Sequence, residues 1–164
     1  LQIREMVKVA KEGEDDVIIV VTGTHRFTNF YSREFFFKNV IIASQLGANY
    51  LSCTTLQAIS PMMISENLFW INSCVFGSFT ILFRPIYDKI LDMSLDRNLA
   101  LEFFNFSMTS NKMILYPFIS DGGDYGIHAG ISDTKTASKN NRQKLDNIQK
   151  AFKRYTRLES KSRF

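Results

Sequence analysis

The most prominent feature of the hydrophobic pattern is a stretch from Asn39 to Phe83 in which Glu66 is the only formally charged residue. Charged residues are frequent on both sides of it. A helix needs about 20 mostly apolar residues to cross the hydrocarbon core of a membrane, and this stretch is long enough for two. We therefore predict two antiparallel transmembrane helices, over residues 39–59 and 62–83, joined by a short turn at Ser60-Pro61.

Both predicted helices contain polar and small residues, which are unfavourable in lipid unless they contact protein. Small residues spaced four apart also allow helix backbones to approach closely. We therefore expect the hairpin to pack against itself and against other transmembrane helices. The residues expected at these contacts are Ser44, Gln45, Ala48, Asn49, Ser52, Ser73 and Gly77.

Cationic residues flank the predicted hairpin on one side only. Arg33 and Lys38 precede its first helix and Arg84 follows its second. The positive-inside rule then places both termini on the cytoplasmic or matrix side. The alternative is a soluble protein with two buried helices, which the polar first segment and a mean hydropathy near zero favour. Charge-free runs of this length are uncommon in soluble chains, so the membrane is the preferred interpretation.

Short strands are predicted on both sides of the hairpin. Val17–Val21 is a dense β-branched run, typical of a buried strand, and Ile3–Val9 alternates loosely. These two segments are expected to pair across the acidic turn between them. Asn98–Met108 and Asn111–Ser120 are expected to form a second β-hairpin, followed by an irregular glycine-rich loop.

The C-terminal segment is strongly basic. From Lys139 to Phe164 there are nine basic and two acidic residues, a net charge of +7, so the remainder of the chain carries −3. One helical stripe is formed by Leu145, Ile148, Phe152 and Tyr155, which predicts a basic amphipathic helix.

Such a helix binds an anionic neighbour, either lipid or an acidic subunit. A phospholipid such as cardiolipin is the only small molecule expected. Nucleic acid is ranked last among the partners, because no aromatic residues are interleaved with the cations to stack bases. The contacts are expected from Lys144, Lys150, Lys153, Arg154 and Arg157.

No residue pattern indicates catalysis. Cys53 and Cys74 are too few for a disulfide framework or a metal site. His25 and His128 have no nucleophile or acid in a connecting pattern. We therefore predict no catalytic residues, no metal and no other cofactor, and a protein that is not an enzyme.

Together these segments predict a membrane α+β protein. Its expected parts are N-terminal strands with a membrane approach (1–34), the transmembrane hairpin (35–86), a β-hairpin module (87–121), a glycine-rich polar loop (122–141) and a basic helical tail (142–164).

The order of these parts resembles a family of mitochondrial inner-membrane two-helix proteins that assist assembly of respiratory complex I and ATP synthase. The residues that carry the resemblance are Arg26-Phe27 before the hairpin and the strand-turn-strand segment ending at Pro117–Asp121. The match is architectural and covers about Thr24–Asp121.

The resemblance implies a non-catalytic accessory subunit or assembly factor of a respiratory-chain (electron transport) or ATP synthase complex. Its expected location is the mitochondrial inner membrane, with both termini on the matrix side and other membrane subunits as partners. The alternative, based on the basic tail, is a soluble organellar ribosomal or RNA-binding component.

Overall fold

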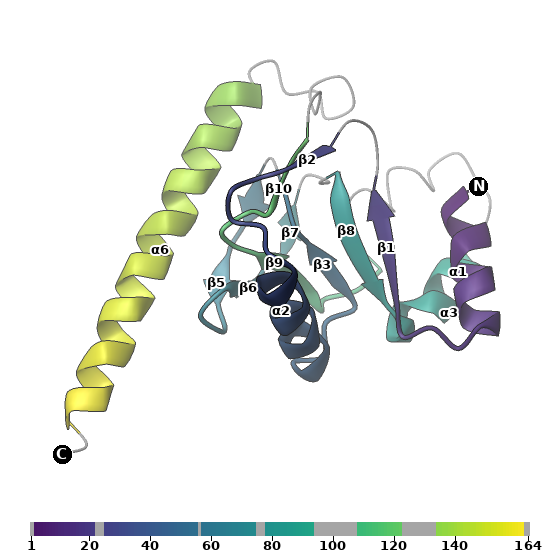
Figure 1. The fold of residues 1–164 in the computed structure, drawn as a ribbon, viewed down its shortest axis with the longest axis horizontal. Coiled ribbons are helices and arrows are strands. Elements are labelled where there is room, and N and C mark those ends of the chain that lie inside the picture. The colour runs from purple at the N-terminus through teal and green to yellow at the C-terminus, as the bar shows by residue number, and fades with distance from the viewer. Residues whose placement is uncertain are drawn as a thin grey trace.

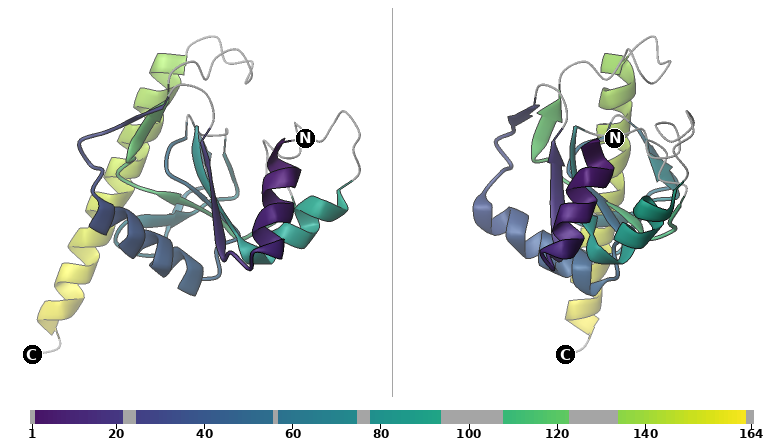
Figure 2. Two further views of the ribbon diagram at one scale, coloured as in Figure 1. Left: turned by 45° about the vertical axis from the view of Figure 1, so that its right-hand side comes forward. Right: turned by 90° about the vertical axis from the view of Figure 1, so that its right-hand side faces the viewer.

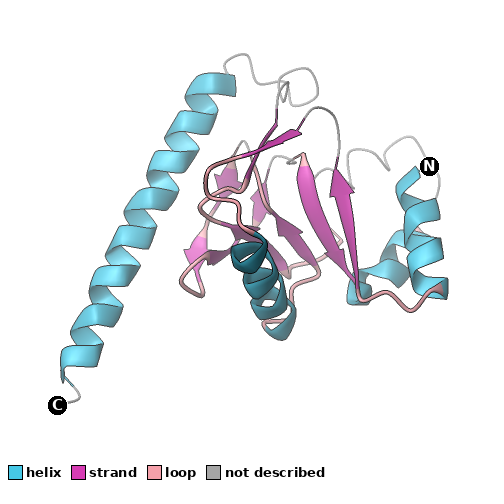
Figure 3. Ribbon diagram, viewed as in Figure 1, coloured by secondary structure: helices cyan, strands magenta, loops and turns pink. Residues whose placement is uncertain are grey.

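The structure is a computed structural model that describes residues 2–21, 25–55, 57–74, 78–93, 108–122 and 134–162. Its centre is a six-stranded mixed sheet, in which only β3 and β9 run parallel to each other (Figures 1 and 3). The strand order across the sheet is β1 (Val17–Val21), β8 (Phe79–Phe83), β3 (Tyr50–Ser52), β9 (Lys112–Leu115), β6 (Leu68–Trp70) and β5 (Met62–Met63).

Helices and two small strand pairs surround this sheet. The strand pairs are β2 (His25–Phe27) with β10 (Ser120–Gly122), and β4 (Ala58–Ile59) with β7 (Ser73–Cys74). The helices are α1 (Gln2–Glu12), α2 (Arg33–Gln45), the 3-10 helix η1 (Arg84–Ile86), α3 (Tyr87–Asp92) and α6 (Thr134–Ser162).

The sheet separates two hydrophobic cores, because neighbouring residues of a strand point to opposite faces. Tyr50 and its register partner Leu82 belong to the core that α1 and α3 cover. Leu51 and its partner Ile81 belong to the core that α2 covers. The right-hand view of Figure 2 shows α2 and α3 on opposite sides of the sheet.

Local signals set both ends of α2. Ser32 is its N-cap, and the Ser32 hydroxyl accepts a hydrogen bond from the Phe35 N–H at 3.1 Å. At the other end Gly47 has a positive φ of 77°, and the Ala48 N–H donates to the Ala43 carbonyl at 2.9 Å. This left-handed glycine ends the helix well before a membrane-spanning length.

The predicted transmembrane hairpin is therefore wrong. Residues 39–59 contain the end of α2, then β3 and β4, and residues 62–83 contain four strands. Among the described residues, no helix has the length and apolar character needed to cross a membrane. The fold is α+β, built on a mixed sheet. The predicted membrane character and the inner-membrane location with both termini on the matrix side are wrong for the same reason.

The charge-free stretch has a different physical origin. Its strands β3 and β8 are buried along their whole length, because helices or loops cover both faces of the sheet. A strand covered on both faces contains few charges, because a charge is as unfavourable in a protein interior as it is in lipid. The hairpin is one of the parts that the resemblance to two-helix proteins requires, so we transfer no functional role from that family to this chain.

The N-terminal segment differs from its prediction as well. Ile3–Val9 lies in α1 and is not a strand, because Ile3, Val7 and Ala10 share one helical face that packs on the core. The strand predicted at Val17–Val21 is confirmed as β1, which pairs with β8. It is not the buried strand that was expected, because it lies at the edge of the sheet with Ile19 and Val21 exposed.

The predicted second β-hairpin can be followed only in part. Most of its first strand, Asn98–Met108, lies outside the described residues. β9, within the predicted second strand, is an interior strand between β3 and β6. The predicted polar loop 122–141 contains the first eight residues of α6, which begins at Thr134.

α6 lies beside β5, the last strand of the sheet (Figure 1). Two hydrogen bonds of Asn141 join α6 to the rest of the protein. The Asn141 Oδ1 accepts the Ala58 N–H at 3.0 Å, and the Asn141 Nδ2 donates to the Thr55 carbonyl at 3.3 Å. One turn further along, Leu145 is fully buried, and Gln149 Nε2 donates to the Glu66 carbonyl at 3.0 Å. The helix is exposed over residues 153–158.

We predict that Asn141→Ala lowers the free energy of unfolding by about 1 to 3 kcal/mol, because it removes two hydrogen bonds to buried backbone groups. Urea denaturation followed by circular dichroism measures the change. Asn140→Ala, at the exposed neighbouring position, is the control and changes stability by less than about 0.5 kcal/mol. Equal effects of the two variants would contradict the anchoring role of Asn141.

Candidate functional site

The residues predicted to pack transmembrane helices do not share an interface. They lie in an exposed helix end, a buried turn and two separate strands, so the structure does not bring them together as a set. Ser44 and Gln45 end α2, Ala48 and Asn49 form the turn before β3, Ser52 is in β3, Ser73 is in β7, and Gly77 lies outside the described residues.

A buried polar cluster lies on the sheet face below α1 and β7. The Tyr50 hydroxyl is 3.8 Å from the Cys74 thiol, and the side chains of Ser52 and Thr80 also hydrogen bond to Tyr50. Lys112 is the register partner of Tyr50 on the adjacent strand and is only 6% exposed. A substrate cannot reach side chains buried to this extent. We therefore assign the cluster a structural role.

Burial also makes these groups poor nucleophiles. It raises the pKa of Cys74 to about 11, and it raises the pKa values of Cys53 and Tyr50 as well. The thiols are therefore protonated at neutral pH, whereas a thiolate is the reactive and metal-binding form. No group of His, Cys, Asp and Glu within the described ranges is placed to hold a metal ion.

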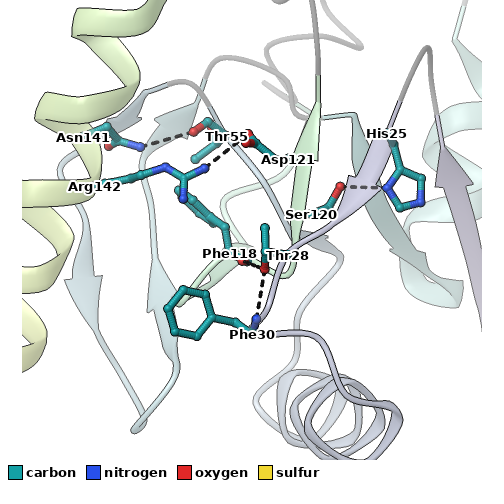
Figure 4. Close-up of polar contacts among 9 residues, drawn as sticks. All are labelled: His25, Thr28, Phe30, Thr55, Phe118, Ser120, Asp121, Asn141 and Arg142. Carbon is teal, nitrogen blue, oxygen red and sulfur yellow. Dashed lines mark hydrogen bonds and ion pairs between the residues drawn. The ribbon is translucent and has the colours of Figure 1, made fainter.

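His25 and Ser120 form a second polar contact, between β2 and β10 (Figure 4). His25 Nδ1 lies 3.0 Å from Ser120 Oγ, and its ring packs edge-on against Phe27 and Phe79. Ser120 is fully buried, so its hydroxyl is not available to an external substrate. This contact holds the two short strands together.

Thr28 shapes the turn that follows β2. Its hydroxyl donates to the Phe118 carbonyl at 2.7 Å and accepts from the Phe30 N–H at 3.2 Å (Figure 4). The turn is thus tied to a segment some 90 residues away in sequence. As a result Phe30 is held at the surface, with 58% of it exposed.

Phe30 is one of three exposed phenylalanines of β2, the following turn and α2, which we call the aromatic surface: Phe27, Phe30 and Phe37. Phe27 is 50% exposed and Phe37 is 48% exposed. Phe27 stacks on Tyr31 with 3.9 Å between ring centroids, and Phe37 packs edge-on against the buried Phe36. Exposed rings that rest on other rings lose little conformational freedom when a ligand binds.

Arg142 connects this aromatic surface to α6. Its guanidinium lies 5.3 Å from the centre of the Phe118 ring and 3.3 Å from a carboxylate oxygen of Asp121. Phe118 in turn accepts the Thr28 hydrogen bond, so the contacts run continuously from Phe30 to α6 (Figure 4). These contacts link the turn that contains Phe30 to the part of α6 that contains Arg142.

Further cations lie on the same flank of α6 as Arg142, at helical spacing. Successive members are three, four or eight residues apart, which places them on one side of the helix over about 33 Å. We call this set the basic flank. Its members are Lys135, Lys139, Arg142, Lys150, Lys153 and Arg157.

The five cations predicted to contact an anionic partner all lie on α6 and are all exposed. Lys150, Lys153 and Arg157 belong to the basic flank. By helical periodicity Lys144 lies on the opposite flank and Arg154 on the solvent side. The sequence analysis missed the aromatic surface, because its rings come from β2, the following turn and α2. The local signal is Phe27 directly after Arg26, with Phe30 three residues further on.

Two open hollows accompany these features. One, of about 500 Å³, lies between α6 and Glu66. The other, of about 640 Å³, lies between α1 and β1. Both are broad and open to solvent, whereas a small-molecule site encloses most of its ligand. The described surface therefore favours binding of an extended partner.

Comparison with known proteins identifies no relative: no family model matches the chain, and no curated protein is significantly similar to it.

We predict that the free energy of unfolding falls as the pH rises from about 9 to 11. Burial raises the pKa of Cys74 from 9.0 to about 11, so the unfolded chain releases its proton first. The stabilisation is complete below pH 9 and is lost at about 1.4 kcal/mol per pH unit above it. Urea unfolding at several pH values measures the slope.

Cys74→Ala is the matching variant. It lowers stability at neutral pH by removing buried atoms, but it makes the alkaline slope shallower by about 1.4 kcal/mol per pH unit. An unchanged slope in Cys74→Ala would show that this thiol is not the titrating group.

Proposed function

We propose that this protein is a non-catalytic module that binds single-stranded nucleic acid. In this proposal the basic flank of α6 contacts the phosphate backbone, and the aromatic surface stacks against the bases. The observation that carries the proposal is the continuous set of contacts from the Phe30 backbone through Thr28 and Phe118 to Arg142, which joins the turn with the exposed Phe30 ring to the cationic helix α6.

The cations support backbone binding. α6 contains nine basic and two acidic residues. One of the acids, Asp146, accepts a hydrogen bond from the Tyr116 hydroxyl at 2.6 Å and so already has a partner within the protein. Cations spaced along a rigid helix release counterions when they neutralise phosphates, which gives affinity without regard to sequence.

The aromatic surface supports stacking. Sequence analysis ranked nucleic acid last because no rings are interleaved with the cations of the tail. Folding supplies rings from a distant segment, with Arg26 exposed beside Phe27 and the Arg33 guanidinium 5.7 Å from the Phe37 ring centre. Exposed rings next to arginines are the features with which proteins hold single strands.

Anionic lipid, such as cardiolipin, is the competing partner. A helix that lies in a membrane surface inserts a continuous apolar face. In α6 the apolar face packs against the rest of the protein, because Leu145 is buried and Ile148 packs against the core. Only Tyr155 and Leu158 remain as exposed large apolar residues of the helix. The lipid proposal therefore has less support than the nucleic-acid proposal.

We predict salt-dependent binding of the full chain to a fluorescein-labelled oligouridine of about 16 nucleotides, measured by fluorescence anisotropy. If the six cations of the basic flank contact phosphates, log K falls with log salt concentration with a slope of about −4. Lys153→Gln with Arg157→Gln makes that slope shallower by about 1 to 2. Lys8→Gln, exposed on α1, is the control and leaves it unchanged.

We predict a different effect for the rings. Phe30→Ala weakens binding by about 1 to 3 kcal/mol and leaves the salt slope unaltered, because it removes stacking and no charge. Phe30→Trp restores the affinity. Tyr155→Ala, an exposed ring on another flank of α6, is the matched control and has no effect.

Two results would overturn the proposed function. One is the absence of an anisotropy change at about 50 mM salt, where electrostatic binding is strong. The other is co-sedimentation of the chain with cardiolipin-containing vesicles under conditions in which oligouridine fails to bind.

A further inference from the structure

The outer edge of β1 has backbone groups that no described strand satisfies. β1 is the first strand of the sheet, and among the described ranges only β8 pairs with it. The Arg84 N–H donates to the Asp16 carbonyl at 2.8 Å, so the backbone N–H and C=O groups of Asp16 point toward β8. By alternation Val17, Ile19 and Val21 direct their N–H and C=O groups to the other side.

Within the described residues, β1 has no charge, proline or bulge to prevent strand pairing, and α1 lies beside it across an open hollow. Natural edge strands contain charges, proline or a bulge, or they are covered by a helix or loop. β1 reads Val-Ile-Ile-Val-Val, and its five residues pair in unbroken register with β8. Ile19 is 44% exposed and Val21 is 45% exposed, so the apolar strand is accessible to solvent.

A groove runs along the edge. α1 forms its other wall, and its volume is about 640 Å³. Val9 on α1 is 66% exposed and Met6 is 39% exposed. The charged residues among its lining are both acidic. The full lining is Glu5, Met6, Val9, Ala10, Asp15, Val17, Ile18 and Ile19.

We propose that this groove binds an extended peptide segment of a partner protein, which adds to β1 as a further strand. The segment has alternating apolar residues, flanked by lysine or arginine. The open backbone edge requires an extended chain, since a docked helix has no free backbone groups to pair with it. The apolar walls take up every second side chain. Glu5 and Asp15 attract the basic flanks.

A second copy of the chain is a poorer fit than such a peptide. Two copies paired through β1 would bring two grooves together, each containing the same acidic residues, Glu5 and Asp15. Like charges brought together at an interface are unfavourable. The groove also lies on a different part of the molecule from the aromatic surface, so this inference does not depend on nucleic-acid binding.

The probe is a fluorescein-labelled synthetic peptide in which valine and threonine alternate between terminal lysines. Fluorescence anisotropy with the full chain measures binding. Replacement of the terminal lysines with glutamates weakens it about tenfold or more, through loss of attraction to the acidic groove. N-methylation of alternate amides also weakens it about tenfold or more, because strand pairing needs those donors.

Hydrogen exchange locates the bound peptide. The amides of Val17, Ile19 and Val21 gain protection on peptide addition. The amides of Ile18 and Val20 already face β8 and do not change.

Matched substitutions test the groove itself. Val9→Lys places a cation in an exposed position of the groove and weakens peptide binding about tenfold or more. Ile41→Lys makes the same change at a 57% exposed position of α2 and leaves binding unaltered. Glu5→Gln with Asp15→Asn abolishes the preference for lysine over glutamate flanks, without altering any buried residue.

Three results would overturn the proposal. The first is failure of the lysine-flanked peptide to bind. The second is equal affinity for the N-methylated peptide, which would show apolar docking without strand pairing. The third is protection of the Val17, Ile19 and Val21 amides without peptide, together with concentration-dependent dimers in sedimentation. That result would identify a second copy as the occupant.

Discussion

The three residues of β3 hold the molecule together. β3 pairs antiparallel with β8 on one side and parallel with β9 on the other, and Tyr50, Leu51 and Ser52 are all fully buried. Leu51 packs into the core under α2, and Tyr50 packs into the core under α1 and α3. Both cores, and both halves of the sheet, therefore meet at one short strand. The aromatic surface depends on it through α2, which leads into β3.

The polar residues of this strand have partners within the protein. Ser52 donates to the Thr54 carbonyl, and its side chain also contacts the Tyr50 hydroxyl. A buried hydroxyl is tolerated when its hydrogen bonds are made inside the protein. Serine and threonine in a charge-free run therefore do not require helix contacts in lipid. Short buried strands accommodate them equally well, and β-branched threonine favours the strand.

Part of the fold could be predicted from local residue patterns. The β-branched run at Val17–Val21 forms a strand as predicted. Ser32 before α2 and Gly47 after it are recognisable helix boundaries, and giving them weight would have broken the supposed first transmembrane helix. Absence of charge indicates burial, but it does not distinguish a lipid surrounding from a protein interior. That ambiguity produced the wrong fold class.

The candidate site depends on contacts that sequence patterns do not report. Thr28 reaches Phe118 across 90 positions, and Arg142 reaches Asp121 across 21. Sequence spacing predicted the cations of the tail, because helical periodicity is local. Sequence spacing does not predict the link between Phe30 and α6, since that link depends on how β2 pairs with β10.

α6 gives the sheet unequal ends. At β5 the helix lies against the last strand and blocks further growth in that direction. At β1 the described chain leaves the ladder open. A strand added at β1 exposes a new edge, so growth is restricted to that one end of the sheet. Two molecules joined edge to edge would form a finite body with a helix at each extremity. The fold therefore combines an open strand edge at β1 with a helix at β5 that opposes polymerisation of the chain into fibres.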